Sequence, residues 1–307
     1  MLDTRGQADF TDMGGPPGLR VYLLGQFRVA IDGRPLPDDA WPLRKARALV
    51  KLLALSPGHR LEREAIVGQL WPDLPPAAAS NNLRYALHVA RRPLPPGMIA
   101  GEGKALALHP GGPVWVDVEA FEAAAAVARR GRDPGDYGAA LDLHGGELLP
   151  DDRYEDWTVA RRDALRALYL LLLADLAAIH EASGAWTAAI TALQRALAEE
   201  PAHEDAHIAL MRLYALAGQR GQALRQWDLL AAALRRQLDA APGAASRALR
   251  EEIAAGRFPP AAAGDPAPGP PGGRGGSNLP VPLTSLIGRA AALVAVKEAL
   301  AHARLVT

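Results

Sequence analysis

The sequence predicts a mainly α-helical chain in which a small α+β domain precedes an all-α domain. Strand-forming segments joined by turn residues are concentrated near the N-terminus. Three segments with helical hydrophobic spacing follow between residues 44 and 92. Beyond residue 114, alanine- and leucine-rich helical segments dominate, and part of them repeats every 34 residues.

The composition is that of an ordinary globular protein. The 307 residues suffice for about two domains, and the 49% hydrophobic and 22% charged residues are close to globular averages. The absence of cysteine excludes disulfides, thiolate metal sites and a cysteine nucleophile. The longest apolar run, residues 167–174, is too short to span a membrane, and no signal segment is recognisable. We therefore expect a cytoplasmic protein without membrane contact.

The net charge of zero conceals two halves of opposite sign. Residues 19–113 contain 13 Lys and Arg against 7 Asp and Glu, a balance of +6. Residues 114–255 contain 15 against 22, a balance of −7. Because a basic surface suits a polyanion, the first half is the candidate for nucleic-acid binding.

The N-terminal domain, placed at residues 19–113, is predicted to follow a disordered leader, residues 1–18, that contains a glycine- and proline-rich run. Residues 21–30 are rich in strand formers, and Asp32-Gly33 after them is a strong hairpin-turn dipeptide. The domain is therefore predicted to open with a small antiparallel sheet.

Three helices and a second hairpin follow this sheet. Helical spacing predicts helices over residues 44–55, 61–71 and 78–92, and loose alternation predicts a two-stranded wing over 98–116. The first of these helices carries four apolar residues on one face: Ala46, Leu49, Val50 and Leu53. Strands, three helices and a terminal hairpin, in this order, are typical of a winged helix-turn-helix domain.

The third helix has the polar face that reading of DNA requires. Its apolar residues Leu83, Leu87, Ala90 and Leu94 share one face. Asparagine pairs with adenine and arginine with guanine in the major groove, and further cations neutralise phosphates. The alternative is a surface helix whose polar face is merely solvated. The predicted DNA-binding residues are Asn81, Arg84, Tyr85, His88, Arg91 and Arg92 on the helix and Lys104 in the wing.

Residues 114–255 are predicted to form an all-α domain that resembles tetratricopeptide (TPR) repeats. Gly184 and Ala189 recur as Gly218 and Ala223, an offset of 34 residues that is the TPR period. Stacked helix pairs bury a continuous core and leave a surface for a partner. An alanine-rich bundle is the alternative, and it is also all-α.

The last 52 residues are predicted to contribute little to the folded part. Residues 256–282 are rich in proline and glycine and are predicted to be a linker. Residues 283–307 contain one short amphipathic segment.

One short motif suggests an enzyme. His203-Glu204-Asp205-Ala206-His207 matches the H-E-x-x-H pattern of zinc enzymes. Such a site needs a third ligand and a substrate cleft, whereas this stretch follows Pro201 and begins a helix, where acidic residues suit the helix dipole. The acid pair Asp151-Asp152 is predicted to lie in a loop, and such pairs are usually solvated. We expect no enzyme activity, no metal and no cofactor.

Several motifs together carry a family resemblance. In the first domain they are Leu24-Gly25-Gln26-Phe27, Arg44-Lys45-Ala46-Arg47-Ala48-Leu49, Leu70-Trp71-Pro72 and Asn81-Asn82-Leu83-Arg84-Tyr85-Ala86-Leu87-His88. In the second they include Val116-Asp117-Val118-Glu119-Ala120-Phe121, Glu155-Asp156-Trp157 and Ala223-Leu224-Arg225-Gln226-Trp227. Through them, residues 19–253 resemble the SARP-type (AfsR-like) transcriptional regulators of antibiotic biosynthesis, in which an OmpR-like winged helix is fused to a bacterial transcriptional activator domain.

The resemblance implies binding to direct repeats in double-stranded DNA, as a homodimer, and recruitment of RNA polymerase. It also implies that residues 283–307 are the start of a truncated nucleotide-binding region like that of the larger members. No phosphate-loop pattern G-x-x-x-x-G-K-[ST] occurs in the sequence, and Ala290 stands where the family usually has Glu.

The sequence thus predicts a DNA-binding transcriptional regulator, an activator, whose helical domain serves oligomerisation or polymerase contact. The rival hypothesis is a TPR-type protein-interaction scaffold whose winged helix no longer binds DNA. On the first hypothesis, residues 19–113 alone should fold but bind DNA poorly, whereas residues 1–255 should bind repeated sites cooperatively.

Overall fold

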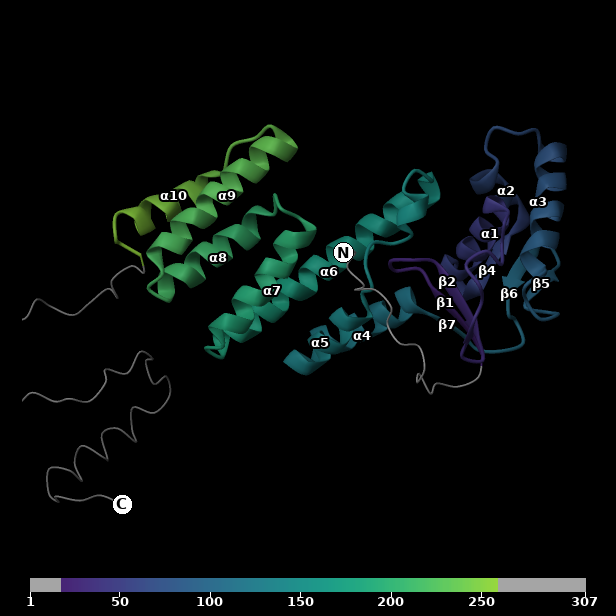
Figure 1. The fold of residues 1–307 in the computed structure, drawn as a ribbon, viewed down its shortest axis with the longest axis horizontal. Helices are drawn as coiled ribbons and strands as arrows, with labels where there is room; N and C mark the ends of the chain where they lie inside the picture. Colours follow the sequence, from purple (N-terminus) through teal and green to yellow (C-terminus); the bar gives the residue numbers. More distant parts are fainter. Residues whose placement is uncertain (1–17, 259–307) are drawn as a thin grey trace, which may run out of the picture. The chain divides into compact units, whose positions relative to one another are not determined.

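The structure is a computed structural model that describes residues 18–258 (Figure 1). The predicted leader up to residue 17, the predicted linker from residue 259 and the predicted nucleotide-binding start at 283–307 lie outside the described residues. Within the described part, a small mixed N-terminal region precedes seven α-helices, which confirms the predicted fold class. No helix of this part is both long and apolar enough to cross a membrane.

A four-stranded sheet opens the fold. It consists of β1 (Leu19–Tyr22), β2 (Arg28–Ile31), β3 (Arg34–Pro35) and β7 (Val114–Val116), in the order β3-β2-β1-β7. Strands β1 and β2 pair antiparallel, whereas β7 pairs parallel with β1. The turn residues Asp32 and Gly33 both have positive φ, 49° and 79°, as a tight hairpin turn requires.

Three helices and a second sheet complete the winged helix. The helices are α1 (Arg44–Leu55), α2 (Arg63–Leu70) and α3 (Pro76–Arg91). The sheet has the order β4-β6-β5 and consists of β4 (Arg60–Glu62), β5 (Ile99–Glu102) and β6 (Ala105–Leu108). A single 3-10 turn, η1 (Pro57–His59), joins α1 to β4.

Two predicted boundaries in this region are wrong, both because strand pairing overrides local pattern. Residues 61 and 62 were expected in the second helix but pair with β6, so α2 begins at Arg63. The hairpin expected over 98–116 ends at Leu108, and residues 114–116 cross to the other sheet as β7. The wing is therefore the β5–β6 hairpin.

Seven helices follow β7. They are α4 (Asp117–Gly131), α5 (Pro134–Leu143), α6 (Asp156–Ala182), α7 (Trp186–Glu199), α8 (Glu204–Leu216), α9 (Arg220–Leu238) and α10 (Ala244–Ala254). A 3-10 turn, η2 (Pro150–Asp152), lies between α5 and α6.

The 34-residue offset marks equivalent positions in two helix pairs. Helices α6 and α7 pack together, as do α8 and α9 (Figure 1). Gly184 before α7 and Gly218 before α9 have φ of 76° and 73°, which favours glycine. Ala189 and Ala223 are fully buried one turn later, where a larger side chain would separate the helices.

The two predicted domains share one continuous hydrophobic core. Leu23 and Leu24, after β1, and Leu148 and Leu149, before η2, are all buried in it. Backbone hydrogen bonds cross the predicted boundary, since Leu149 donates its N–H to the carbonyl of Leu23 at 2.9 Å. The described residues fall within one compact unit.

A fragment ending at residue 113 would lack β7 and residues 147–149, so Leu23 would lose its apolar cover and its backbone partner. In contrast to the expectation from sequence, we expect this fragment to unfold at a lower temperature than the full chain, or without a cooperative transition. Thermal unfolding followed by circular dichroism measures this. A fragment as stable and as cooperative as the full chain would contradict it.

Acid should destabilise the helical part through His144, which ends α5. Its ring stacks on Tyr169 with centroids 4.0 Å apart, and burial lowers the pKa of His144 to about 4 from its ordinary value of 6.5. Because the unfolded chain binds the proton first, this contribution is complete above pH 6.5 and is lost as pH falls toward 4. In His144→Phe, the melting temperature should fall less over this range than in the parent. Equal losses in the two proteins would exclude this role.

Candidate nucleic-acid interface

Helix α3 is held firmly against the rest of the winged helix. Pro76 occupies its first position, where the fixed φ of proline suits a helix start. Leu83, Leu87, Ala90 and Leu94 are buried, as predicted. α3 packs on α1, and the indole Nε1 of Trp41 donates a hydrogen bond to the carbonyl of Ala90 at 2.9 Å. The orientation of α3 is thus tied to α1.

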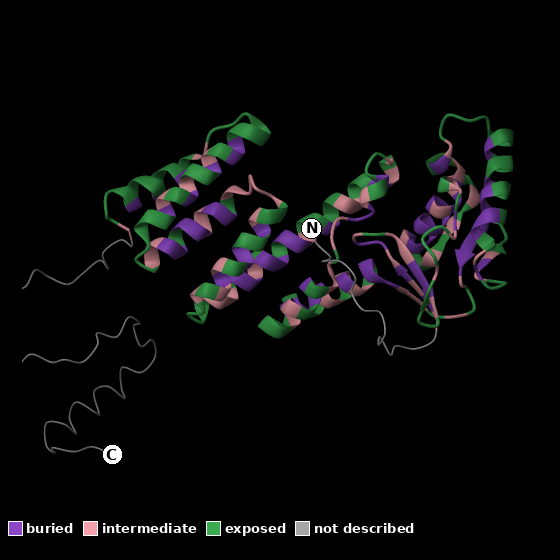
Figure 2. Ribbon diagram, viewed as in Figure 1, coloured by how far each residue is buried: buried purple, intermediate pink, exposed green. Residues whose placement is uncertain are grey.

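The opposite face of α3 faces solvent (Figure 2). All seven predicted DNA-binding residues are exposed: Asn81, Arg84, Tyr85, His88, Arg91, Arg92 and Lys104. Tyr85 is 63% exposed, which is unusual for a large aromatic side chain. α3 contains no acidic residue. The exposed face therefore combines positive charge with groups that hydrogen-bond to base edges.

Two polar contacts position cations on this face. The guanidinium of Arg84 donates to the side-chain oxygen of Asn81, one turn earlier, at 2.9 Å. Arg91 donates from Nε to the carbonyl of Ile99 in β5 at 2.9 Å. Arg91 thereby anchors the wing to the end of α3, a role that the sequence did not indicate.

The wing brings Lys104 close to the start of α2. Gly103 and Lys104 form the turn between β5 and β6, with Gly103 at a φ of 61°. The carbonyl of Lys104 accepts a hydrogen bond from the backbone N–H of Arg63 at 3.0 Å. The guanidinium of Arg63 lies over Gly101 in the wing. Sequence reasoning did not single out Arg63, because the second helix was expected to begin at residue 61.

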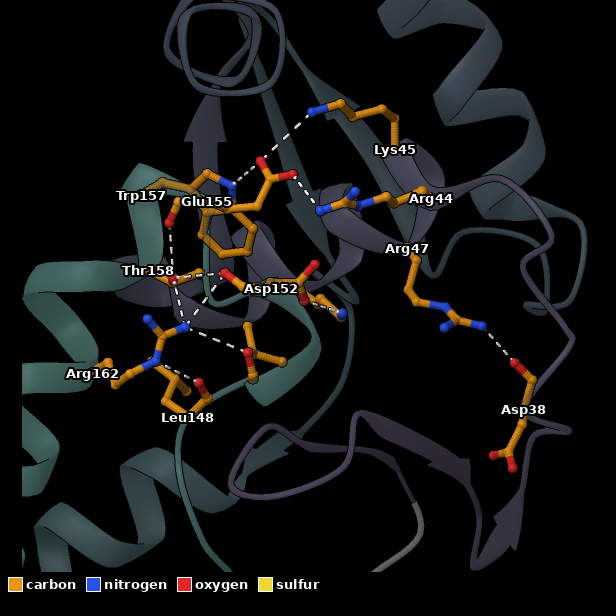
Figure 3. Close-up of polar contacts among 12 residues, drawn as sticks. Asp38, Arg44, Lys45, Arg47, Leu148, Asp152, Glu155, Trp157, Thr158 and Arg162 are labelled. Carbon is orange, nitrogen blue, oxygen red and sulfur yellow. Dashed lines mark hydrogen bonds and ion pairs between the residues drawn. The ribbon is translucent and has the colours of Figure 1, made fainter.

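A second polar cluster joins α1 to the segment before α6 (Figure 3). Lys51 in α1 forms an ion pair with Asp152 of η2, and both side chains are almost fully buried. At the rim, Glu155 accepts from Arg44 at 3.0 Å and lies 3.6 Å from the amino group of Lys45. We call this set of contacts between residues 44–51 and 152–155 the joint.

Arg162 in α6 contacts the backbone next to the joint (Figure 3). Its guanidinium donates to the carbonyl oxygens of Leu148 at 3.1 Å and Asp152 at 3.4 Å, and to the hydroxyl of Thr158 at 2.9 Å. A planar guanidinium with five donors can hold several carbonyl oxygens at once. Arg162 thereby fixes the backbone that carries Asp152.

Asp117, the first residue of α4, is buried beside the end of β1. Its carboxylate accepts hydrogen bonds from the backbone N–H groups of Leu23 and Leu24 at 2.8–2.9 Å. Burial raises the pKa of Asp117, and these hydrogen bonds act against that rise. The carboxylate satisfies two backbone donors that β1 leaves unpaired, and so connects the sheet to the helical part.

The H-E-x-x-H segment makes structural contacts within the helical part. His203 caps α8 by accepting the N–H of Ala206 at 3.3 Å. Both ring nitrogens of His207 have partners, Gln226 at Nδ1 and the carbonyl of Pro201 at Nε2. Burial lowers the pKa of His207, in accord with a neutral ring. Glu204 accepts the N–H of Gly243, at the start of α10. The described residues contain no cluster of three potential metal ligands.

Comparison with known families identifies the helical part. The model of the bacterial transcriptional activator domain matches residues 116–254. Residues 116–254 are a bacterial transcriptional activator domain. The chain is also similar to the transcriptional regulatory protein EmbR of Mycobacterium tuberculosis and of Mycobacterium bovis, with 26% identity over 243 residues. The resemblance to SARP-type regulators that the sequence motifs indicated is confirmed.

The structural comparison covers both the winged helix and the helical part. The structure of Mycobacterium tuberculosis EmbR in complex with a low affinity phosphopeptide matches 78% of this chain with a TM-score of 0.62 and 25% identity. The match covers 66% of that chain, and the sequence match covers 62% of the length of the EmbR relatives and 75% of the present chain. The chain therefore spans less than two thirds of the length of the EmbR relatives.

Proposed function

We propose that this chain is a sequence-specific, DNA-binding transcriptional activator that works in the cytoplasm without enzymatic activity. In this proposal α3 reads bases in the major groove and the wing contacts the backbone. The helical domain pairs two copies on repeated sites and contacts RNA polymerase. The observation that carries the proposal is the exposed face of α3, which presents Asn81, Arg84 and Tyr85 to solvent.

The distribution of charge on the winged helix supports DNA as the ligand. Further cations lie at the end of α3 (Arg92), in the wing (Lys104) and at the start of α2, where Arg63 contacts the wing. The similarity to EmbR, a transcriptional regulatory protein, supports the same class of function. Arginine and asparagine side chains, such as those of Arg84 and Asn81, can recognise guanine and adenine edges, which backbone contacts alone do not distinguish.

The rival hypothesis is a protein-interaction scaffold whose winged helix has lost DNA affinity. The scaffold hypothesis gives no reason for α3 to lack acidic residues, whereas a helix that approaches phosphates is expected to lack them. A gel-shift assay of the full chain against promoters adjoining its gene distinguishes the two. A specific shift that unrelated DNA does not compete away supports the regulator, and no shift on any of these promoters at low salt supports the scaffold.

Replacement of Arg84 by alanine should weaken specific binding by about 1–3 kcal/mol and relax base preference at one position, because a bidentate contact to a base edge is lost. Arg34→Ala is the matched control, since Arg34 is exposed on β3 in the other sheet. Binding is measured on a series of operators with single base changes. Equal weakening on every DNA sequence would remove Arg84 from base recognition.

Replacement of Arg92 or Lys104 by alanine should weaken binding uniformly on all sequences, because these residues are assigned to phosphates. Each variant should lower the slope of log K against log salt concentration by about one unit. Titrations at several salt concentrations measure this, with Arg34→Ala again as control. If a variant leaves the slope unchanged, the replaced residue does not contact a DNA phosphate.

A further inference from the structure

The joint has a buried ion pair at its centre, in a space that apolar side chains could also fill. Lys51 lies in the middle of α1, flanked by buried Val50 and Leu52, and is only 2% exposed. Asp152 is 4% exposed. A buried ion pair is weak evidence for stability, because apolar residues of similar volume often replace it without loss. Such a pair can instead favour one relative orientation of the two domains. In any other orientation a buried charge would lose its partner.

Backbone contacts also hold the chain before η2 against the residues that follow β1. Leu24 pairs with Leu148 in an isolated antiparallel bridge, and Gly25 donates its N–H to the carbonyl of Glu147 at 2.9 Å. Gly25 has a φ of 82°, and a Cβ at this position would lie 2.9 Å from the carbonyl of Gly145. The chain before η2 therefore packs closely against Leu24 and Gly25, which follow β1.

The ion pair is connected to α3 through rigid elements. Arg162 holds the backbone of Asp152, and Asp152 pairs with Lys51 in α1. α1 packs on α3, and Trp41 bonds to the end of α3. Each step is a helix contact or a hydrogen bond of a buried or half-buried group. These contacts form a continuous connection from Arg162 to α3 as long as Lys51 and Asp152 stay paired.

We propose that Lys51 and Asp152 are positioning residues that hold the winged helix and the helical domain in a single relative orientation, so that the helical domain sets the direction in which α3 points. Glu155, whose partners Arg44 and Lys45 are more exposed, contributes little to this orientation, because exposed ion pairs are weak. The orientation is a property of the protein alone. Its effect on DNA rests on the proposed function.

The first experiment measures the orientation directly in the full chain. The sequence has no cysteine, so Gln69→Cys in α2 and Gln237→Cys in α9, both exposed, accept a donor and an acceptor dye at those two positions only. Time-resolved energy transfer then gives the distribution of distances between the two domains. The parent should give one narrow distribution, and Glu155→Gln, the matched control at the rim, should give the same.

The decisive variant is the apolar double replacement Lys51→Met with Asp152→Leu. It removes both charges together, so it should fold with a melting temperature close to that of the parent and yet give a broader or shifted distance distribution. Asp152→Ala should give the same change of distribution with lower stability. If the double variant folds and keeps the narrow distribution of the parent, the pair has no positioning role and the proposal is overturned.

The second experiment tests the consequence for DNA. The full chain is titrated against two copies of its site whose separation is increased one base pair at a time. The parent should show an affinity maximum that returns after about 10 base pairs, the helical repeat of DNA. Two rigid protomers can contact each other only when their sites face the same side of the double helix. The double variant should bind a single site like the parent but lose this periodicity.

The outcomes separate the two proposals. If the parent binds no DNA, the proposed function fails, and the distance measurement still decides the role of the joint. If the parent binds with a spacing maximum and the double variant retains the same maximum, the positioning role is overturned while DNA binding stands.

Discussion

The pairing of Lys51 with Asp152 constrains the structure around it. A lysine in the middle of α1 must be neutralised, because an unpaired charge among leucines is strongly unfavourable. Its partner comes from a segment about 100 residues later, so that segment must be folded back and held. Arg162 holds it by its carbonyl oxygens, and residues 147–149 pair with the chain after β1. The winged helix and the activator domain therefore share one core.

This joint changes how the charge asymmetry of the sequence is understood. The excess of 13 cations over 7 anions in residues 19–113 suggested a surface for a polyanion. Yet Arg44, Lys45 and Lys51 pair with acidic residues of the second half. Opposite net charges of the two halves therefore partly reflect their attraction to each other. The local positive charge of α3 and the wing, and not the net charge of residues 19–113, favours DNA as the ligand.

The histidines of the activator domain show why spacing alone cannot assign chemistry. His203 and His207 have the separation of two zinc ligands, but His203 caps its own helix and His207 bonds to a residue that only the folded chain brings near. Gln226 of α9 donates to the ring of His207, and Glu204 caps the start of α10. A neutral ring, donating at one nitrogen and accepting at the other, is satisfied without a metal. The motif thus links three helices.

The sequence by itself determined the fold class, most of the helices, the buried and exposed faces of α3 and the 34-residue repeat, because hydrophobic periodicity and turn chemistry are local properties. The positions of Asn81 and Arg84 on the surface followed from the same periodicity, and that of Lys104 from its place in the predicted wing. Only the tertiary structure decided that residues 114–116 join β1, that Arg91 anchors the wing and that Lys51 is buried. Each of these depends on a partner distant in sequence, and local pattern carries no information about such a partner. The physical reason is that strand pairing and the burial of charged groups depend on contacts between residues distant in sequence, and these contacts form only when the chain folds.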